Sequence, residues 1–67
     1  SDENPEIYPT PEAGETGSPI AQTLFFGVEG IRAMTIAGDT LTITRESDAI
    51  WEILLDDIRS TIRDFFL

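Results

Sequence analysis

The last twenty residues of the chain carry the feature that most constrains its fold. In residues 48–67, large apolar residues recur at helical spacing and fall within an arc of about 160° when successive residues are placed 100° apart. These residues are Ile50, Trp51, Leu54, Leu55, Ile58, Ile62, Phe65 and Phe66. Charged residues gather on the opposite side, so the pattern predicts an amphipathic helix. A helix with so much apolar surface needs a large cover, which the rest of the chain or a partner has to supply.

The apolar side of this helix divides into an inner set and an edge. We expect the inner set to point into the core; it comprises Ile50, Leu54, Ile58 and Phe65. Of the four remaining residues, Trp51, Leu55 and Phe66 form what we call the aromatic edge, where a missing strand or a partner would bind. An alternative interpretation is that Trp51 packs half-buried over a hairpin, as large aromatic residues commonly do.

Residues 1–17 have the composition of an acidic, flexible tail. They hold three prolines, two glycines, five acids and no basic residue, and their only substantial apolar residues are Ile7 and Tyr8. Such a segment cannot bury enough surface to offset its ordering entropy. We therefore predict a tail over residues 1–17 and a folded domain over residues 18–67. Two alternatives stay open: an acidic docking peptide anchored by Ile7 and Tyr8, or a short edge strand made by these two residues.

A short helix is predicted from Pro19 to about Phe26. Ser18 suits the N-cap, where its side-chain oxygen accepts a free backbone amide, and Pro19 suits the first helical position. Gly27 suits a left-handed residue that ends the helix. Two turns of helix are not stable alone, so this helix has to pack against another element.

Residues 31–37 and 40–45 are predicted to form a β-hairpin. Apolar and polar residues alternate in the second strand, and Gly38-Asp39 is suited to the tight turn between the two strands. The phase of the first strand is ambiguous, and we favour the larger apolar area. The buried set is then Met34, Ile36, Leu41 and Ile43. Ser47 or Asp48 is expected to cap the final helix.

The composition excludes several kinds of chemistry. The chain has 67 residues, 13 acids, four arginines and a net charge of −9, and it contains no cysteine, histidine or lysine. Disulfides, zinc sites, iron–sulfur ligation and Schiff-base chemistry within this chain are therefore excluded. The negative charge makes nucleic acid or an anionic membrane an unfavourable partner. No apolar run is long enough to span a membrane, and no signal peptide is recognisable. The first residue is serine, which suggests an excised, processed or tagged chain.

Paired acids are the only constellation that could carry chemistry. Glu52 and Asp56 share a helix face and could form a weak hard-cation site, but no third ligand is in register. A solvated acidic face is the simpler interpretation. Residues 27–30 contain two glycines without the strand, helix and lysine of a phosphate loop. We therefore expect no enzyme, no catalytic residue and no metal or cofactor site in this chain.

The order of these segments resembles the N-terminal domain of Nfu/NifU-type iron–sulfur scaffold proteins. Residues 18–21 (S-P-I-A), 24–25 (L-F) and 28–31 (V-E-G-I) are similar to the S-P-L-A…L-F…I-x-G-V signature of that family. Residues 34–45 match its hairpin, and residues 49–66 match its D-W-x-x-L…I-x-x-F-F helix. The resemblance covers about 50 residues, counted over the matching segments. The strand segment with which the family usually opens is replaced here by a shorter, acidic, proline-rich run, so either the chain is shortened or Ile7-Tyr8 is a remnant of that strand.

The resemblance implies an accessory domain that acts through protein contacts. The cluster-binding C-x-x-C motif of the family lies in a separate C-terminal domain, so a cluster would reach this chain only through that domain or a partner. Partners would be cluster-assembly proteins or a C-x-x-C domain, with self-association possible, in the cytoplasm or in an organelle of a eukaryotic host. The expected fold is α+β, with an α-β-β-α core in which an antiparallel hairpin packs against two helices, and an N-terminal strand as a possible addition. The alternative is a generic acidic module that binds a basic protein.

Overall fold

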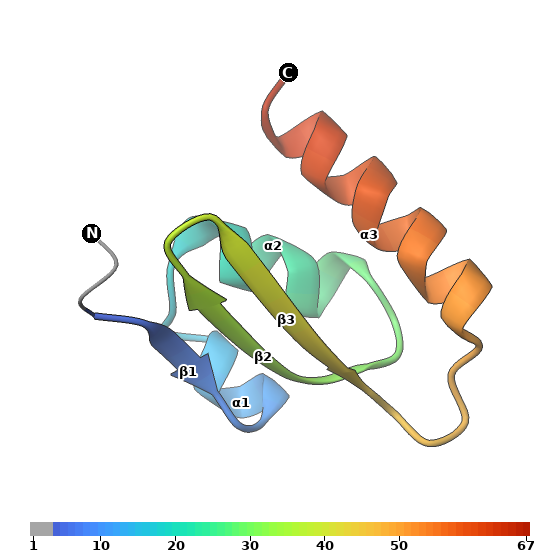
Figure 1. Ribbon diagram of the computed structural model, residues 1–67, viewed down its shortest axis with the longest axis horizontal. Coiled ribbons are helices and arrows are strands. Elements are labelled where there is room, and N and C mark those ends of the chain that lie inside the picture. Colours follow the sequence, from blue (N-terminus) through green and yellow to red (C-terminus); the bar gives the residue numbers. More distant parts are fainter. Residues whose placement is uncertain (1–3) are drawn as a thin grey trace.

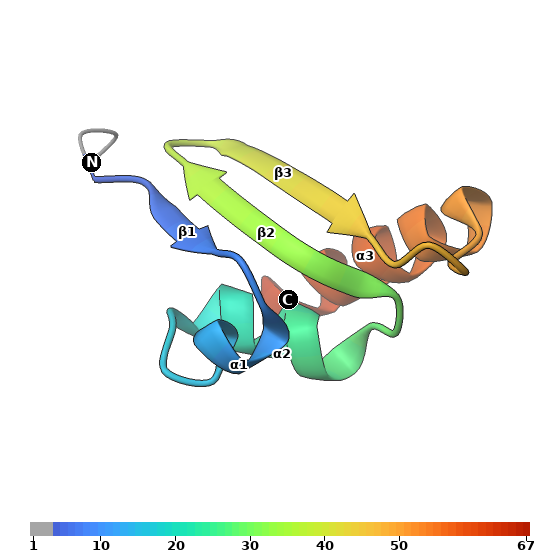
Figure 2. The same ribbon diagram turned by 90° about the horizontal axis from the view of Figure 1, so that it is seen from below.

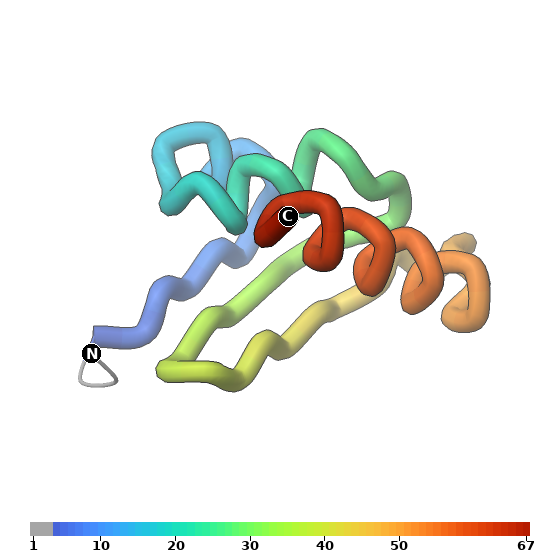
Figure 3. Tube along the Cα trace, turned by 90° about the horizontal axis from the view of Figure 1, so that it is seen from above, coloured from blue at the N-terminus to red at the C-terminus, as the bar shows by residue number. Residues whose placement is uncertain are grey.

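The computed structural model describes residues 4–67 and contains a three-stranded antiparallel sheet with its helices on one face (Figure 1). The elements in chain order are β1 (Glu6–Tyr8), α1 (Pro11–Gly14), α2 (Pro19–Gly27), β2 (Ile31–Ala37), β3 (Thr40–Arg45) and α3 (Trp51–Phe65). The strand order is β1-β2-β3, so β2 is central and the other two are edge strands. Views from below and from above show the helices together on the same side of the sheet (Figures 2 and 3). The predicted α+β class, the hairpin on two helices and the added N-terminal strand are confirmed.

A bulge in β2 decides which side chains enter the core. The register shifts between Ile31 and Ala33, which leaves Arg32 as an extra residue opposite β3. An extra residue resets the alternation of a strand, so Ile31 and Met34 are both buried while Arg32 is exposed. The hairpin residues expected to be buried do face the core: Met34 lies in it, and Ile36, Leu41 and Ile43 are partly buried and pack against it.

Residues 4–17 differ from the predicted flexible tail. β1 pairs with β2 so that Tyr8 lies opposite Met34, and the Tyr8 ring is only 8 % exposed. This ring packs edge-to-face on Phe25 of α2, with the ring centroids 6.0 Å apart. The composition of the segment hid this anchor, because one buried aromatic pair supplies more stabilisation than the average hydropathy of the stretch suggests. Residues 1–3, which the tail prediction also covers, lie outside the described residues.

Two glycines let the N-terminal segment close around this aromatic pair. A Cβ atom on Gly14, at the end of α1, would overlap the Phe25 ring. A Cβ on Gly17 would lie 2.6 Å from the Tyr8 ring. The backbone between β1 and α2 therefore approaches both rings at distances that a side chain would prevent.

The ends of α2 are built differently from the prediction. Ser18 occupies the N-cap position, but its hydroxyl does not cap the helix; instead its backbone N–H donates to the Tyr8 hydroxyl at 3.1 Å. Gly27 is the last helical residue rather than a left-handed one, and Val28 follows in extended conformation. The positive φ angles among the glycines lie at Gly30 (101°) and Gly38 (60°), the latter in the predicted hairpin turn.

The final helix begins later than the capping residues Ser47 and Asp48 predict. α3 starts at Trp51, and Ile50 holds the N-cap position without a side-chain cap. The reason lies at the end of β3, where Arg45 Nη1 donates to the carbonyl oxygens of Glu46, Ser47 and Ala49, each at 3.2 Å. These bonds hold residues 46–49 in a turn, so the helix cannot form there.

Candidate partner-binding surface

The core contacts of α3 fix which of its sides remains free. Leu54 and Ile58 are 2 % and 6 % exposed and are its two fully buried apolar residues. Ile50 and Phe65, which were expected to be inward, are instead 58 % and 37 % exposed. The helix starts at Trp51, so Ile50 precedes its first turn, and Phe65 lies in the last turn. Only the middle of the inner set is therefore buried.

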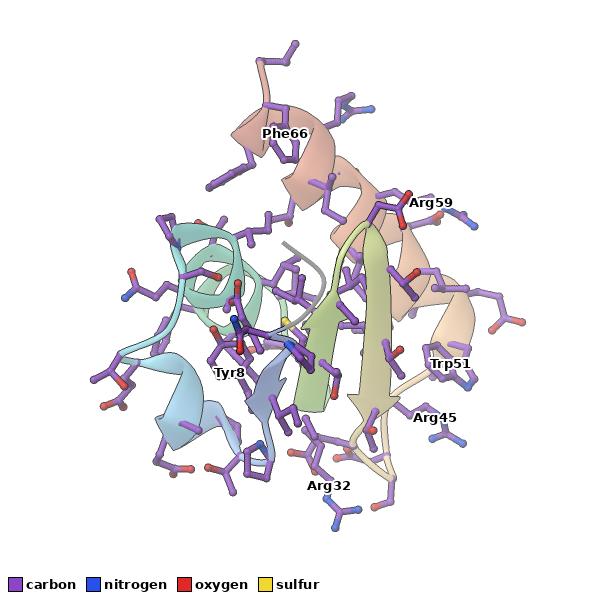
Figure 4. All side chains as sticks on the ribbon, turned by 60° about the vertical axis from the view of Figure 1, so that its left-hand side comes forward. Tyr8, Arg32, Arg45, Trp51, Arg59 and Phe66 are labelled. Carbon is purple, nitrogen blue, oxygen red and sulfur yellow. The ribbon has the colours of Figure 1, made fainter. Side chains whose placement is uncertain are left out.

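The aromatic edge remains in solvent along one flank of α3. Trp51, Leu55 and Phe66 are 40 %, 38 % and 73 % exposed. Trp51 and Leu55 are one helical turn apart and so share a face, and Phe66 lies at the far end of the helix, well away from Trp51 (Figure 4). Whether this edge binds a partner remains a prediction. The exposure of Trp51 also agrees with the half-buried position of the alternative interpretation.

Each end of the aromatic edge borders a hollow against the hairpin. The first, which we call the arginine hollow, has a volume of about 440 Å³ and is lined by Arg32, Ile43, Thr44, Arg45, Ser47 and Trp51. The second, the tip hollow, has a volume of about 250 Å³ and lies at the hairpin turn; its lining includes Ile36, Leu41, Ile62 and Phe66. Both reach apolar hairpin residues that the helices leave partly uncovered. Partly exposed apolar residues thus lie in two separate hollows between the aromatic edge and the hairpin.

Arg45 connects the sheet to this edge. Its three hydrogen bonds to the turn carbonyls fix the guanidinium, whose Cζ lies 5.8 Å from the centroid of the Trp51 ring. That distance is within the range of cation–π attraction. Figure 4 shows Arg45 and Trp51 next to each other beside the end of β3. Sequence reasoning missed this role, because the partners of Arg45 are backbone carbonyls and a ring six residues away.

The arginines fall into two pairs with different surroundings. On α3, Arg59 Nη1 lies 3.8 Å from Asp56 Oδ1 and Arg63 Nε lies 3.6 Å from Asp64 Oδ1, and all four side chains are largely exposed. Such surface ion pairs contribute little to stability. Within residues 4–67, Arg32 and Arg45 form no ion pair with a carboxylate. Both of these arginines line the arginine hollow.

A third hollow, on the opposite flank of α3, is acidic. It has a volume of about 380 Å³, and Glu29, Glu46, Asp48 and Asp57 line it together with Ile50 and Ile53. No basic residue of the described chain lines it. The two flanks of α3 therefore differ in charge, with arginines at the aromatic edge and acids on the other side.

A small polar cluster joins β1 to the start of α2. The Tyr8 hydroxyl donates to Glu6 Oε1 and accepts the Ser18 N–H. The Ser18 hydroxyl is buried and forms no hydrogen bond of standard geometry, yet it faces the Glu6 carboxylate closely enough to lower its pKa. Ser18 is the main cause of the lowered pKa of Glu6 and Tyr8 the second, with desolvation opposing both. Hydrogen bonds to the ionised form account for this direction.

The acids show no arrangement suited to a metal. Among residues 4–67 no group of three or more acidic side chains is placed to hold an ion. Glu52 and Asp56, the pair considered from the sequence, are both exposed on α3. The donor set of the chain also lacks thiolate and imidazole, so its own residues do not fit an iron–sulfur cluster. In the described part of the chain, no helix is long and apolar enough to span a membrane.

Comparisons with known proteins give a consistent result. The whole chain, residues 1–67, matches the family described as "Scaffold protein Nfu/NifU N terminal". The human protein "NFU1 iron-sulfur cluster scaffold homolog, mitochondrial" is 40 % identical over 60 residues, which cover 88 % of this chain and 23 % of the human protein. The protein of the same name from Drosophila ananassae is 42 % identical over 50 residues, or 75 % of this chain and 17 % of the relative. "NifU-like protein 5, mitochondrial" from Arabidopsis thaliana is 33 % identical over 49 residues, 73 % of this chain and 18 % of that protein. The chain thus spans less than a quarter of these relatives.

Proposed function

Because the chain belongs to the Nfu/NifU N-terminal domain family, as the resemblance predicted, we propose that it is a non-catalytic accessory domain that assists iron–sulfur cluster assembly or delivery through protein contacts. The observation that carries the proposal is the aromatic edge, whose Trp51, Leu55 and Phe66 remain exposed beside two hollows. Aromatic residues and arginine are the types most enriched at the energetic centres of protein interfaces. These exposed apolar residues contribute little to the core of the domain, so a role in binding explains them better than a role in folding.

In this proposal the cluster is cargo and is not held by the chain. No residue here can supply the cysteine thiolates that hold clusters. The ligands would come from a separate C-x-x-C domain or from a partner, and this domain would orient the two proteins. We place this activity in the cytoplasm, or in an organelle of a eukaryotic host, as the names of the mitochondrial relatives suggest. Fluorescent tagging and cell fractionation would check the location.

Affinity capture with paired variants tests the proposal. The bait is the chain itself, compared with a variant in which Trp51, Leu55 and Phe66 are all alanine. The matched control is Ile53→Ala, which removes an exposed apolar side chain from the other flank of α3. We expect the native chain and the control to retain cysteine desulfurase, scaffold or apo-acceptor proteins, identified by mass spectrometry, and the triple variant to lose them. Equal capture by all three baits would contradict the proposal.

The acidic hollow supports a second candidate function, a module that binds a basic protein. Four carboxylates surround its apolar floor, and the net charge of the chain is −9. Attraction between exposed charges is strongly screened as the ionic strength rises. Binding through this hollow would therefore collapse between low and moderate salt and would be lost in Asp48→Asn/Asp57→Asn. Binding through the aromatic edge would persist at moderate salt and in the Asp48→Asn/Asp57→Asn variant.

A further inference from the structure

The two edges of the sheet are not equally available for pairing. β1 has three residues and is bounded by Pro5 and Pro9, which have no backbone N–H to donate. β3 has six residues, no proline, and a partner strand on one side only. Its outer edge therefore presents unpaired backbone N–H and C=O groups, which is the arrangement onto which an extended segment of another protein can add.

In residues 4–67 no helix covers this outer edge. α3 packs chiefly against α2 rather than along β3, and seen from above its axis runs in a different direction from the hairpin (Figure 3). The arginine hollow lies at the end of the same edge, because two consecutive residues of β3, Thr44 and Arg45, line it. Trp51 borders the hollow from the α3 side. A strand added to β3 would therefore lead directly into this hollow.

The charges of the hollow select the kind of segment. The chain has 13 acids and four arginines, yet Arg32 and Arg45 form no carboxylate ion pair within residues 4–67. Arg45 Nη1 is fixed by the turn carbonyls, which orients its guanidinium in advance. Guanidinium groups are well suited to bind carboxylates. The net charge of −9 repels a polyanion such as nucleic acid. A single carboxylate carries one charge, and in this hollow its nearest charged neighbours are the two arginines.

We propose that the outer edge of β3 receives an extended segment of a partner protein as a fourth strand, with an acidic side chain of that segment bound between Arg32 and Arg45 and an apolar one on Trp51. The proposal rests on the proposed function, for which it names the mode of docking. A second copy of this chain is a poor occupant, because two copies would each bring a charge of −9 to the contact.

Selection from a displayed library of random twelve-residue peptides tests this inference. We expect the enriched peptides to alternate apolar and polar residues and to share one aspartate or glutamate. We expect Arg32→Glu to weaken the binding of a synthetic enriched peptide at least tenfold. Replacement of the acidic residue of the peptide by the corresponding amide should have a similar effect. Arg32 is exposed, so the variant should fold. The matched control is Arg63→Glu, which reverses a charge on α3 about three turns beyond Trp51 and outside the arginine hollow.

Amide hydrogen exchange of the peptide complex reports the docking mode. Addition of a strand should protect β3 amides at least tenfold more than in the free chain and leave those of β1 unchanged. Enrichment of basic peptides, protection confined to α3, absence of enrichment, or dimerisation of the chain through β3 in light scattering would each overturn the inference. The two proposals can be told apart. If protein capture depends on the aromatic edge but not on Arg32, the proposed function stands and only the added-strand mode of binding is contradicted.

Discussion

The two edge strands of the sheet pair with the same central strand but differ in how they are anchored. β1 and β3 both pair with β2, but β1 is short and lies between prolines. Its Tyr8 is buried against Phe25 and is hydrogen-bonded to Glu6 and Ser18. β3 is twice as long, carries no such anchor, and ends at an arginine beside an exposed tryptophan. One edge strand is thus fixed to the core by side-chain packing, while the other has no such anchor and a longer open edge.

This difference separates the part of the chain that maintains the fold from the part available to a partner. Substitutions of Tyr8 and of the residues packed on its ring should change the free energy of unfolding, because the Tyr8 side chain is buried. Substitutions at the exposed positions of β3, such as Thr42, and along the aromatic edge should change binding far more than stability. The following predictions test each half of this comparison.

The largest effect is expected at Tyr8. Tyr8→Ala should lower the free energy of unfolding by about 3–5 kcal/mol, since it removes a buried aromatic side chain from a small core. Thr42→Ala, at an exposed position of β3, should cost about 1 kcal/mol or less. Urea denaturation followed by tryptophan fluorescence measures both. Similar costs for the two variants would show that the two edges do not differ in this way.

The next effect concerns the close approach of α1 to α2. Gly14→Ala should destabilise the chain by about 1–3 kcal/mol, because the added Cβ would overlap the Phe25 ring. Gly27→Ala is the matched control: its Cβ would lie 3.9 Å from Thr61 Cγ2, an ordinary contact, so it should be neutral or stabilise the helix by up to about 1 kcal/mol. Thermal unfolding of the two variants distinguishes them. A harmless Gly14→Ala would mean that α1 is not held against Phe25.

A smaller effect is expected when only the hydroxyl of Tyr8 is removed. Tyr8→Phe keeps the ring on Phe25 but leaves the Ser18 N–H without its acceptor. The loss should be about 1 kcal/mol, the typical net contribution of one hydrogen bond. Chemical denaturation checks this value against Tyr8→Ala. If the two variants cost the same, the polar cluster rather than the ring holds β1.

The smallest effect is the pH dependence of Glu6. Its pKa in the folded chain lies below the ordinary value of 4.5, so the unfolded chain binds this proton at a higher pH than the folded one. The contribution of Glu6 to stability is therefore complete above pH 4.5 and is lost as the pH falls through the lower, folded pKa. Glu6→Gln should flatten this part of the stability–pH curve. An unchanged slope would contradict the lowered pKa of Glu6 in the folded chain.

Local patterns predicted the elements that have strong periodicity. The helix after residue 48 and the hairpin with its turn at Gly38 follow from spacing, and the burial of Met34 follows from the choice of the larger apolar area. The aromatic edge was also named from helical spacing, and its residues are exposed. These features depend on neighbours within about one turn or one strand.

Features that depend on contacts distant in sequence could not be predicted. Tyr8 is buried by Phe25 from another element, so the average composition of residues 1–17 gave no indication of it. The β2 bulge brings Ile31 inward through a register set by β3. The hydrogen bonds of Arg45 are local, but they are made to backbone carbonyl groups, which every residue possesses, so no residue type in the pattern indicated them.

One measurement tests the central claim, that a partner binds the open β3 and aromatic edge and leaves the β1 edge free. It is amide hydrogen exchange, resolved by residue, on the chain alone and bound to a cluster-assembly protein retained in the capture experiment. The account predicts increased protection in β3 and in the first turns of α3, with β1 unchanged, and loss of this protection in Trp51→Ala. Protection confined to β1 or to the acidic hollow around Asp48 and Asp57 would contradict the account.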